Sequence, residues 1–421
     1  MRVVHIINAD TRGGAPKAAF AINKALNSIG IVSNLLVQRK FSRDDTVFSV
    51  SNNFIEKQKT NFRMLLDLIQ MKLLTKTERG RFSFASVGTD ISGYKLIRDA
   101  DVIQLHWINE GYISIRSLSK LAELNKPIVW TLHDMWAFTG GCHYSAGCLE
   151  YEKSCGNCPY LKSPSTNDKS RKNWKKKNEQ YSRLNPTIVT PSNWMADCAK
   201  RSSLLNKFLI NVIPNPIDID IYKPIEKTVA RKMLKLPNDK KLILFGSLNV
   251  KEERKGFKHL INVLQVLIKN HPSLKNETEL LMYGTATAEE LNLLPLKVNS
   301  LGRIANENIL VECYNSADIF VAPSLEDNLP NTVMESLACG LPVAAFNIGG
   351  MPDMIENEKN GYLAKPFSVE DLAEGIFGII NDKVINKNSG QAGRETVTNN
   401  YSFKKAAVKY NSLYMSLLNH T

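Results

Sequence analysis

The chain has 421 residues, of which 43% are hydrophobic, and a formal net charge of +13. This length exceeds what one hydrophobic core usually supports, so we expect two domains; the apolar content is ordinary for a globular protein. No stretch of about 18 apolar residues is present, which argues against a membrane-spanning helix. The positive charge favours an anionic partner. Nucleic acid is the weaker candidate, because no zinc-finger, RNA-recognition or basic-zipper motif is visible.

The first predicted element is a buried strand over residues 3–7, too short for the apolar core of a signal peptide. We therefore expect the protein to stay in the cytoplasm. Gly13 and Gly14 follow, and then apolar residues recur at helical spacing up to Gly30. The start of such a helix offers backbone N–H groups to an anion, although a plain strand-to-helix turn looks the same. The turn lacks the G-x-G-x-x-G pattern, which argues against a nicotinamide enzyme.

Two basic segments could contact a membrane. Residues 39–80 are poorly patterned, but within them residues 61–75 mix Phe62 and several leucines with Arg63 and Lys72. This is the composition of a basic amphipathic helix on a lipid surface; a helix with its apolar side in the core is the reading we favour. Residues 169–177 hold six cations around Trp174, which suits anionic head groups or a solvated helix face.

Two predicted strands, residues 101–105 and 127–132, run directly into His106 and His133. The carboxyl ends of parallel strands form the ligand-binding edge of an α/β sheet. Histidines at two matching positions on that edge favour a functional role, whereas a single one is usually structural.

Four of the seven cysteines lie close together in the loop at residues 141–160, at positions Cys142, Cys148, Cys155 and Cys158. Four thiolates could hold a structural zinc ion, with His143 as a substitute ligand. Reduced, packed thiols are the alternative. In a cytoplasmic chain, clustered cysteines favour metal binding over disulfides.

A second α/β pattern begins with a strand at residues 242–245. Ser247 follows, and then Arg254-Lys255-Gly256. Two cations beyond a strand end could form part of a ligand site, and a solvated helix start is the alternative.

The most informative stretch is strand 318–322, a polar loop, a short helix ended by Gly340, and strand 342–346. This βαβ unit places the loop acids Glu326 and Asp327 at a ligand crevice. Glu335 lies on the helix just beyond them.

The stretch resembles the donor-binding motif of retaining glycosyltransferases of family 4, in which an acid, seven residues and a glutamate precede Gly-x-Pro-Val. Asp327 and Glu335 have that spacing, with aspartate in place of the usual glutamate. The resemblance covers nearly the whole chain, and the region from His133 through the cysteine loop is similar to the colanic-acid and capsule branch. Ser247 replaces the usual arginine, and Pro216 replaces a glycine between the domains.

The resemblance implies an α/β GT-B fold, with two Rossmann-like, doubly wound domains and a cleft between them. The acceptor-side domain would span residues 1–213, including the cysteine-rich loop 141–160. The donor domain would span residues 214–400, and a terminal helix at 401–421 would cross back to the first domain.

The resemblance also implies the activity. A sugar would pass from a UDP- or GDP-sugar to a lipid-linked saccharide in bacterial surface polysaccharide synthesis, on the inner face of the plasma membrane. No cofactor would be required for the chemistry. The alternatives are a GT-B protein that binds nucleotide-sugars without catalysis, and a nucleotide-sugar epimerase.

The residue roles come from the same resemblance. His133 and one or both of Asp327 and Glu326 would address the transferring sugar. The further donor contacts would be Arg254 and Lys255 at the diphosphate, Glu335 at the ribose, and Gly14, Ile304, Asn328 and Leu329.

Overall fold

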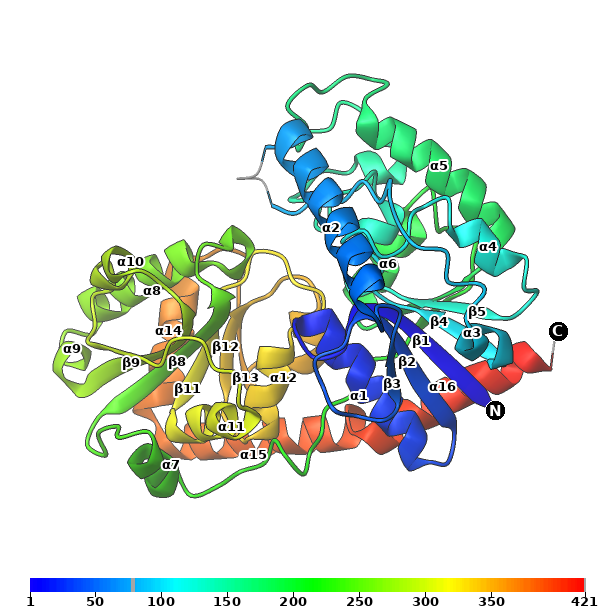
Figure 1. Cartoon of the computed structure of the whole chain (residues 1–421). Helices are drawn as coiled ribbons and strands as arrows, with labels where there is room; N and C mark the ends of the chain where they lie inside the picture. Colours follow the sequence, from blue (N-terminus) through cyan, green and yellow to red (C-terminus); the bar gives the residue numbers. More distant parts are fainter. Residues whose placement is uncertain (77–79, 420–421) are drawn as a thin grey trace. The chain divides into compact units, whose positions relative to one another are not determined.

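The computed structural model describes residues 1–76 and 80–419 (Figure 1). The chain forms two compact units, Met1–Pro216 with Phe403–Thr421 and Ile217–Ser402. Among the described residues, each unit contains one fully parallel sheet, of seven strands in the first and six in the second. Helices cover these sheets, so the predicted pair of doubly wound α/β domains is confirmed.

The N-terminal unit has the strand order β3-β2-β1-β4-β5-β6-β7. Its strands are β1 (Arg2–Ala9), β2 (Val32–Arg39), β3 (Val47–Ser49), β4 (Val102–Leu105), β5 (Ile128–Thr131), β6 (Thr187–Thr190) and β7 (Ile210–Val212). Its helices are α1 (Gly14–Ser28), α2 (Phe54–Leu74), α3 (Lys95–Asp99), α4 (Leu118–Ala122), α5 (Lys169–Leu184), α6 (Asn193–Arg201) and α16 (Phe403–Leu418). The strand order reverses between β1 and β4, and that switch point is where such sheets bind ligands.

The C-terminal unit has the order β10-β9-β8-β11-β12-β13, with its switch point between β8 and β11. Its strands are β8 (Lys241–Asn249), β9 (Thr278–Thr285), β10 (Val298–Ser300), β11 (Ile319–Ala322), β12 (Val343–Phe346) and β13 (Gly361–Ala364). Its helices are α7 (Lys227–Met233), α8 (Phe257–Asn270), α9 (Leu274–Glu277), α10 (Ala288–Asn292), α11 (Glu307–Ser316), α12 (Asn331–Ala338), α13 (Met351–Met354), α14 (Val369–Asn381) and α15 (Lys383–Asn400).

Both sheets are buried on two faces, which explains why their strands are apolar runs without alternation. β11 and β12, for example, are buried at every position. The end of the chain contributes to the first core, because α16 packs on α1 (Figure 1). Its Tyr410 and Tyr414 join the buried cluster around Val3 and Ile22. Of the terminal helix expected at residues 401–421, the last two residues lie outside the described part of the chain.

Helix α2 is not the core-facing helix that we favoured from the sequence. Its buried residues are the polar Thr60 and Asp67, while Phe62 and Leu73 are 61% and 66% exposed. Arg63 holds the inner side of the helix through a hydrogen bond from its Nε to the Gly111 carbonyl (3.2 Å). The helix is thus anchored by polar contacts and turns its apolar side to solvent. Residues 77–79, part of the poorly patterned segment 39–80, lie outside the described ranges.

Helix α5 carries the basic run of residues 169–177, but its tryptophan is not fully exposed, as contact with a membrane would require. Trp174 is half-buried and donates from Nε1 to Ser203 Oγ (3.0 Å). Lys177 is fully buried, and its ammonium group donates to the carbonyls of Trp136 and Thr139. The exposed cations that remain are Lys169, Lys172, Lys175 and Lys176.

Candidate active site

The loop after β11 is held against the turn before α8, at the switch point of the C-terminal sheet. The Leu325 N–H donates to the Arg254 carbonyl (2.8 Å), which joins the two segments. Gly256 stands in the turn with φ +74°, and a Cβ atom there would lie 1.7 Å from the Pro323 carbonyl oxygen. Glycine is needed at this position for both its conformation and its lack of a side chain.

Asp327 and the two predicted diphosphate-binding cations form one cluster in this loop. The buried Asp327 carboxylate lies 2.7 Å from Lys255 Nζ and 3.0 Å from Arg254 Nη1. Burial would raise the pKa of Asp327, but the charges of Lys255 and Arg254 outweigh it and hold the pKa below its usual value. Arg254 and Lys255 are 20% and 21% exposed, so the alternative of a solvated helix start does not describe them.

The two neighbouring acids lie differently. Asp327 is turned inward onto the cations, whereas Glu326 is half-buried and its carbonyl oxygen accepts from Arg254 Nη1 (2.9 Å). Behind the loop, Gly350 N–H donates to the Asp327 carbonyl (3.0 Å). A Cβ atom on Gly349 would lie 2.0 Å from that same oxygen. The Gly-Gly turn therefore packs directly on the acidic loop.

Glu335 is buried on α12, next to the acidic loop in the chain. Its Oε2 accepts from Tyr314 Oη (2.7 Å), which in turn lies 2.7 Å from Tyr283 Oη. Because a carboxylate only accepts hydrogen bonds, it orients both tyrosine hydroxyls. Tyr283 and Tyr314, which come from β9 and α11, were not predicted from the sequence.

The other predicted site residues of the C-terminal unit lie in the acidic loop or close to the ends of other strands. Asn328 and Leu329 are buried in the acidic loop, and Ile304 is half-buried after β10. Ser247, which stands where the resemblance expects arginine, is buried and donates to the Asn249 carbonyl (3.0 Å).

Two histidines at the carboxyl edge of the N-terminal sheet, His106 and His133, are joined to each other and to His5 within β1. His106 Nδ1 lies 2.9 Å from His133 Nε2, and His106 Nε2 lies 2.9 Å from His5 Nδ1. Burial lowers the pKa of His133 to about 4 and that of His5 to about 3. The two histidines predicted from strand ends are thus brought together. His5 was missed because it lies inside β1, although a polar residue within a fully buried strand was the available signal.

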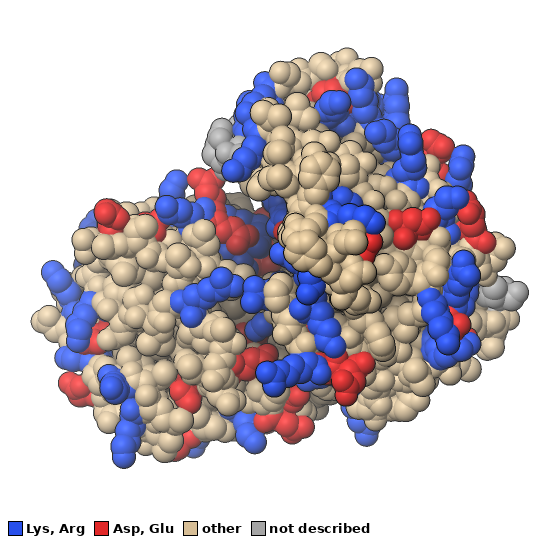
Figure 2. Space-filling view, viewed as in Figure 1, with Lys and Arg blue, Asp and Glu red and all other residues tan. Residues whose placement is uncertain are grey.

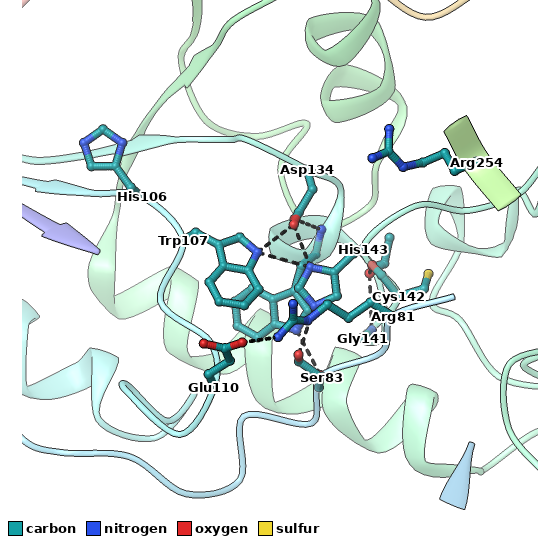
Figure 3. Close-up of polar contacts among 12 residues, drawn as sticks. Arg81, Ser83, His106, Trp107, Glu110, Asp134, Gly141, Cys142, His143 and Arg254 are labelled. Atoms are coloured by element: carbon teal, nitrogen blue, oxygen red, sulfur yellow. Dashed lines mark hydrogen bonds and ion pairs between the residues drawn. The ribbon is translucent and has the colours of Figure 1, made fainter. Parts of the chain in front are cut away.

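A second network, drawn in Figure 3, surrounds Asp134. Its Oδ2 accepts from Trp107 Nε1 (2.7 Å) and lies 2.6 Å from His143 Nδ1, while His143 Nε2 lies 2.9 Å from Ser83 Oγ. The order carboxylate, imidazole, hydroxyl is that of a nucleophilic triad, but Ser83 is buried and the network ties the cysteine loop to the sheet. Both ring nitrogens of His143 have these partners in the structure, and its role as a substitute zinc ligand stays a prediction.

A third polar network surrounds Glu110 at the switch point between β1 and β4. Its carboxylate lies 2.5 Å from Arg81 Nη2 and 2.9 Å from Arg39 Nη2, and it accepts from Asn8 Nδ2 (2.8 Å). Burial would raise the pKa of Glu110, but the charge of Arg81 and then that of Arg39 lower it overall. These residues come from distant segments, and no motif in the sequence indicates that they meet.

The four clustered cysteines line one small cavity together. In the described part of the chain, however, no group of three or more His, Cys, Asp or Glu side chains is arranged to hold a metal ion. Burial raises the pKa of Cys155 to about 12 and that of Cys158 to about 11, as the alternative of packed, reduced thiols requires. Zinc stays a prediction, and the zinc content of the purified protein would test it.

Gly14 is the first residue of α1, as the turn pattern predicted. Gly13 precedes it with φ 114° and provides no side-chain cap, and the first turn contains no acidic residue. This helix start therefore has the backbone donors and the positive end of the helix dipole that an anion needs.

Two family models match the chain. Residues 75–221 match "Glycosyltransferase Family 4" and residues 239–382 match "Glycosyl transferases group 1". An uncharacterized glycosyltransferase of Haemophilus influenzae is 32% identical over 44% of this chain and 50% of its own length. The putative colanic acid biosynthesis glycosyl transferase WcaC of Escherichia coli is 24% identical over 66% of this chain and 69% of its own length. The chain spans about half the length of the first of these relatives.

Solved structures show the same fold at low sequence identity. Sucrose-phosphate synthase from Thermosynechococcus elongatus has a TM-score of 0.67 at 16% identity, with 100% of both chains covered. The Anabaena protein HepE in complex with UDP-glucose has a TM-score of 0.64 at 15% identity, covering 99% of this chain and 100% of its own. These similarities show the GT-B fold.

Proposed function

Because the chain belongs to the group 1 glycosyltransferases of family 4, we propose that it transfers a sugar, with retention, from a nucleotide-sugar donor to a saccharide acceptor. The observation that carries the proposal is the cluster of Arg254, Lys255 and Asp327 at the switch point of the C-terminal sheet. Two cations fixed in place before the donor arrives suit the charge that develops on a leaving diphosphate.

Asp327 prepares this cluster for its anion. It holds both cations at short distances in a buried setting, so neither has to be gathered from solvent when a diphosphate binds. Preorganised charge of this kind costs little reorganisation during the reaction. Positive charge at the leaving group then comes from side chains of the protein itself.

Glu335 supports the choice of a nucleotide donor. Its carboxylate is fixed by Tyr314 and can accept further bonds, as recognition of ribose hydroxyls requires. HepE, which shares the fold, binds UDP-glucose, and we propose a UDP- or GDP-sugar here. Ile304, Asn328 and Leu329 complete the donor contacts of the C-terminal unit.

The N-terminal unit contributes two elements of its own to the proposed reaction. His133 would contact the transferring sugar, and the start of α1 at Gly14, where Gly13 supplies no side-chain cap, would direct backbone N–H groups toward the diphosphate. We place the acceptor's recognition on this unit, with a lipid-linked saccharide of bacterial surface polysaccharide synthesis as the acceptor.

Helix α2 supports a lipid-linked acceptor and a location at a membrane surface. Its exposed apolar residues include Phe54, Ile55, Phe62, Leu65, Leu68, Ile69 and Leu73, and Lys57, Lys59 and Lys72 lie on the same helix. Figure 2 shows lysines and arginines bordering an uncharged surface on this unit. Such a helix binds anionic lipid head groups by lying in the interface. No helix in the described ranges is long and apolar enough to cross a bilayer.

The test is nucleotide release from a panel of UDP-, GDP- and TDP-sugars, with membrane lipid extract as the source of acceptor. We expect release with one donor and a fall of roughly tenfold or more in Glu335→Gln, because a charge-assisted hydrogen bond is lost. Glu370→Gln, an exposed glutamate on α14, is the matched control and should retain activity.

Each alternative has its own outcome in this assay. Tight nucleotide-sugar binding without turnover on any acceptor would mean a binding protein that lacks catalysis. Nucleotide release without a glycosylated product would favour the epimerase. Failure to bind or release any donor would contradict the donor-site argument.

A further inference from the structure

One continuous chain of hydrogen bonds crosses the N-terminal unit and ends at His133. Its seven members are Asp44, Thr46, Asn23, Ser33, His5, His106 and His133. The six links measure between 2.6 and 3.0 Å. Four of the members, Asn23, Ser33, His5 and His106, are buried, and the other three, Asp44, Thr46 and His133, are half-buried. The chain links a loop carboxylate to the carboxyl edge of the sheet.

The direction of the first links is set by Asp44. Burial would raise the pKa of Asp44, but hydrogen bonds from Thr46 and the charges of Lys24 and Lys40 hold it below its usual value, so the group is a carboxylate. The Thr46 hydroxyl must donate to it (2.6 Å) and therefore accepts from Asn23 Nδ2 (2.8 Å). This turns Asn23 Oδ1 toward the next member of the chain.

The direction then passes through Ser33 to the histidines. Ser33 Oγ donates its only proton to Asn23 Oδ1 (2.7 Å), so it can only accept from His5 Nε2 (3.0 Å). Asn27 holds Ser33 in place, because its Oδ1 accepts from the Ser33 N–H (3.2 Å) and its Nδ2 donates to the Ser33 carbonyl (2.9 Å). His5 therefore carries its proton on Nε2.

The same donor and acceptor assignment applies to the three imidazole rings. Burial keeps His5, His106 and His133 neutral by lowering each pKa, and a neutral imidazole has one donor and one acceptor nitrogen. With Nε2 of His5 protonated, its Nδ1 accepts from His106 Nε2 (2.9 Å). His106 Nδ1 then accepts from His133 Nε2 (2.9 Å).

We propose that this chain fixes the tautomer of His133, with the proton on Nε2 and the lone pair on Nδ1, so that His133 addresses the transferring sugar as a hydrogen-bond acceptor. It would then receive a bond from a sugar hydroxyl. Asp44, Ser33, His5 and His106 act as positioning residues, since they reach the sugar only through His133. The sugar contact rests on the proposed function, whereas the tautomer does not.

The opposite direction is disfavoured by the chemistry at Asp44. Reversal would turn the carbonyl of Asn23 toward Thr46, whose single hydroxyl proton would then face two acceptors, Asn23 Oδ1 and the Asp44 carboxylate. One of them would be left without a donor. A hydroxyl cannot satisfy both, so the carboxylate selects the direction.

A fixed acceptor has a consequence for specificity. A site built to accept a bond from a hydroxyl rejects analogues that lack the hydrogen, because its own polar atom is then left unsatisfied. A donor whose hydroxyl facing His133 is replaced by fluorine keeps the size and loses the proton. We expect such an analogue to be a poor donor, and a deoxy analogue likewise.

The tautomer can be measured directly on the full chain. Two-bond ¹⁵N–¹H correlations of the protein labelled in its seven histidines distinguish protonated from bare ring nitrogens, with single histidine variants providing the assignments. At pH 7 we expect Nε2 to be protonated and Nδ1 bare in His5, His106 and His133. A His133 that is charged, or protonated on Nδ1, would overturn the proposal whether or not any donor is turned over.

Asp44→Asn tests the anchor, because an amide can donate to Thr46 and allow the reverse direction. We expect a mixed tautomer at His133 and a fall of about twofold to thirtyfold in kcat/KM, the usual range for residues that act through a network. Asp45→Asn, an exposed neighbour, is the control and should change neither. An unaltered tautomer in Asp44→Asn would refute the anchoring role, and a mixed tautomer with full activity would refute the sugar contact.

Discussion

The two units use different physical means to hold polar groups in a buried site. The histidine site of the N-terminal unit relies on neutral hydrogen bonds that run in one direction through three rings. The C-terminal unit relies on opposite charges, with Asp327 between Arg254 and Lys255. A network of neutral hydrogen bonds stays ordered only while its members keep their protonation states. A buried ion pair is stable only while all of its charged partners are present. The two units should therefore fail under different conditions.

The largest expected difference is in acid sensitivity. His5, His106 and His133 have pKa values lowered by burial, and Asp134 beside His133 offsets this only in part. The unfolded chain takes up protons below pH 6.5 while the folded chain does not. The stabilisation that comes from keeping these histidines neutral is therefore complete above that pH. As the pH drops toward 4, the free energy of unfolding falls by up to about 1.4 kcal/mol per pH unit for each histidine.

This prediction can be assigned to one unit by spectroscopy. The five tryptophans, Trp107, Trp130, Trp136, Trp174 and Trp194, all belong to the N-terminal unit, so their fluorescence follows its unfolding, while circular dichroism follows both units. We expect urea midpoints by fluorescence to fall steeply from pH 7 to pH 5, and less steeply in His5→Gln. The charges around Asp327 hold its pKa below the usual value, so its contribution persists over this range and is lost only as the pH falls through that lowered value. Equal acid sensitivity of both signals would contradict the comparison.

Removal of one cation tests the charged cluster. Lys255→Ala removes positive charge from the proposed diphosphate site and leaves Arg254 as the one cation that the structure pairs with Asp327. We expect a loss of roughly 10²- to 10³-fold in kcat, the range for deletion of one preorganised group at a developing charge. Lys258→Ala, a lysine that is 81% exposed three residues away, should stay near the parent rate. Equal losses in the two variants would mean that general surface charge, not this cluster, supports the reaction.

The turn that carries these cations can be examined for stability. Gly256→Ala would place its Cβ atom against the Pro323 carbonyl in a left-handed conformation, and we expect a loss of about 3 kcal/mol in the free energy of unfolding. Gly302→Ala has a similar positive φ but meets nothing within 4 Å, so it should cost only about 1 kcal/mol. Urea unfolding followed by circular dichroism measures both. Similar losses would show that backbone strain, rather than the close approach, governs this turn.

The sequence predicted the two sites unequally, for a physical reason. Glu326, Asp327 and Glu335 belong to one contiguous strand–loop–helix segment, and short-range spacing is visible in a single chain. The parts of the N-terminal site come from distant segments, so Glu110 with Arg81, and His5 with His106, become neighbours only through the strand order. A fold class follows from apolar runs and turns, whereas such pairings need the register of the sheet.

Helix α2 shows the limit of reasoning from periodicity. Its pattern indicated a helix with one apolar side but could not say which way that side turned. Polar contacts decided it, because Thr60 bonds to Ser51 and Arg63 bonds to Gly111 on the inner face. Tertiary contacts of single polar residues thus overrode the usual rule that the apolar side packs inward.

The smallest expected effect concerns this exposed helix, and it separates membrane contact from folding. In Phe62→Ser with Leu73→Ser, apolar area that already faces solvent is removed, so the free energy of unfolding should change by less than about 0.5 kcal/mol for each substitution. Binding to vesicles that contain anionic lipid should weaken roughly tenfold, because the buried apolar area in the interface is smaller. Co-sedimentation at fixed lipid concentration measures it. Leu209→Ser, which changes a leucine outside α2 that is 61% exposed, is the control. Unchanged sedimentation of the double variant would mean that basic charge alone attracts the vesicle, and high salt would then abolish binding of both variants equally.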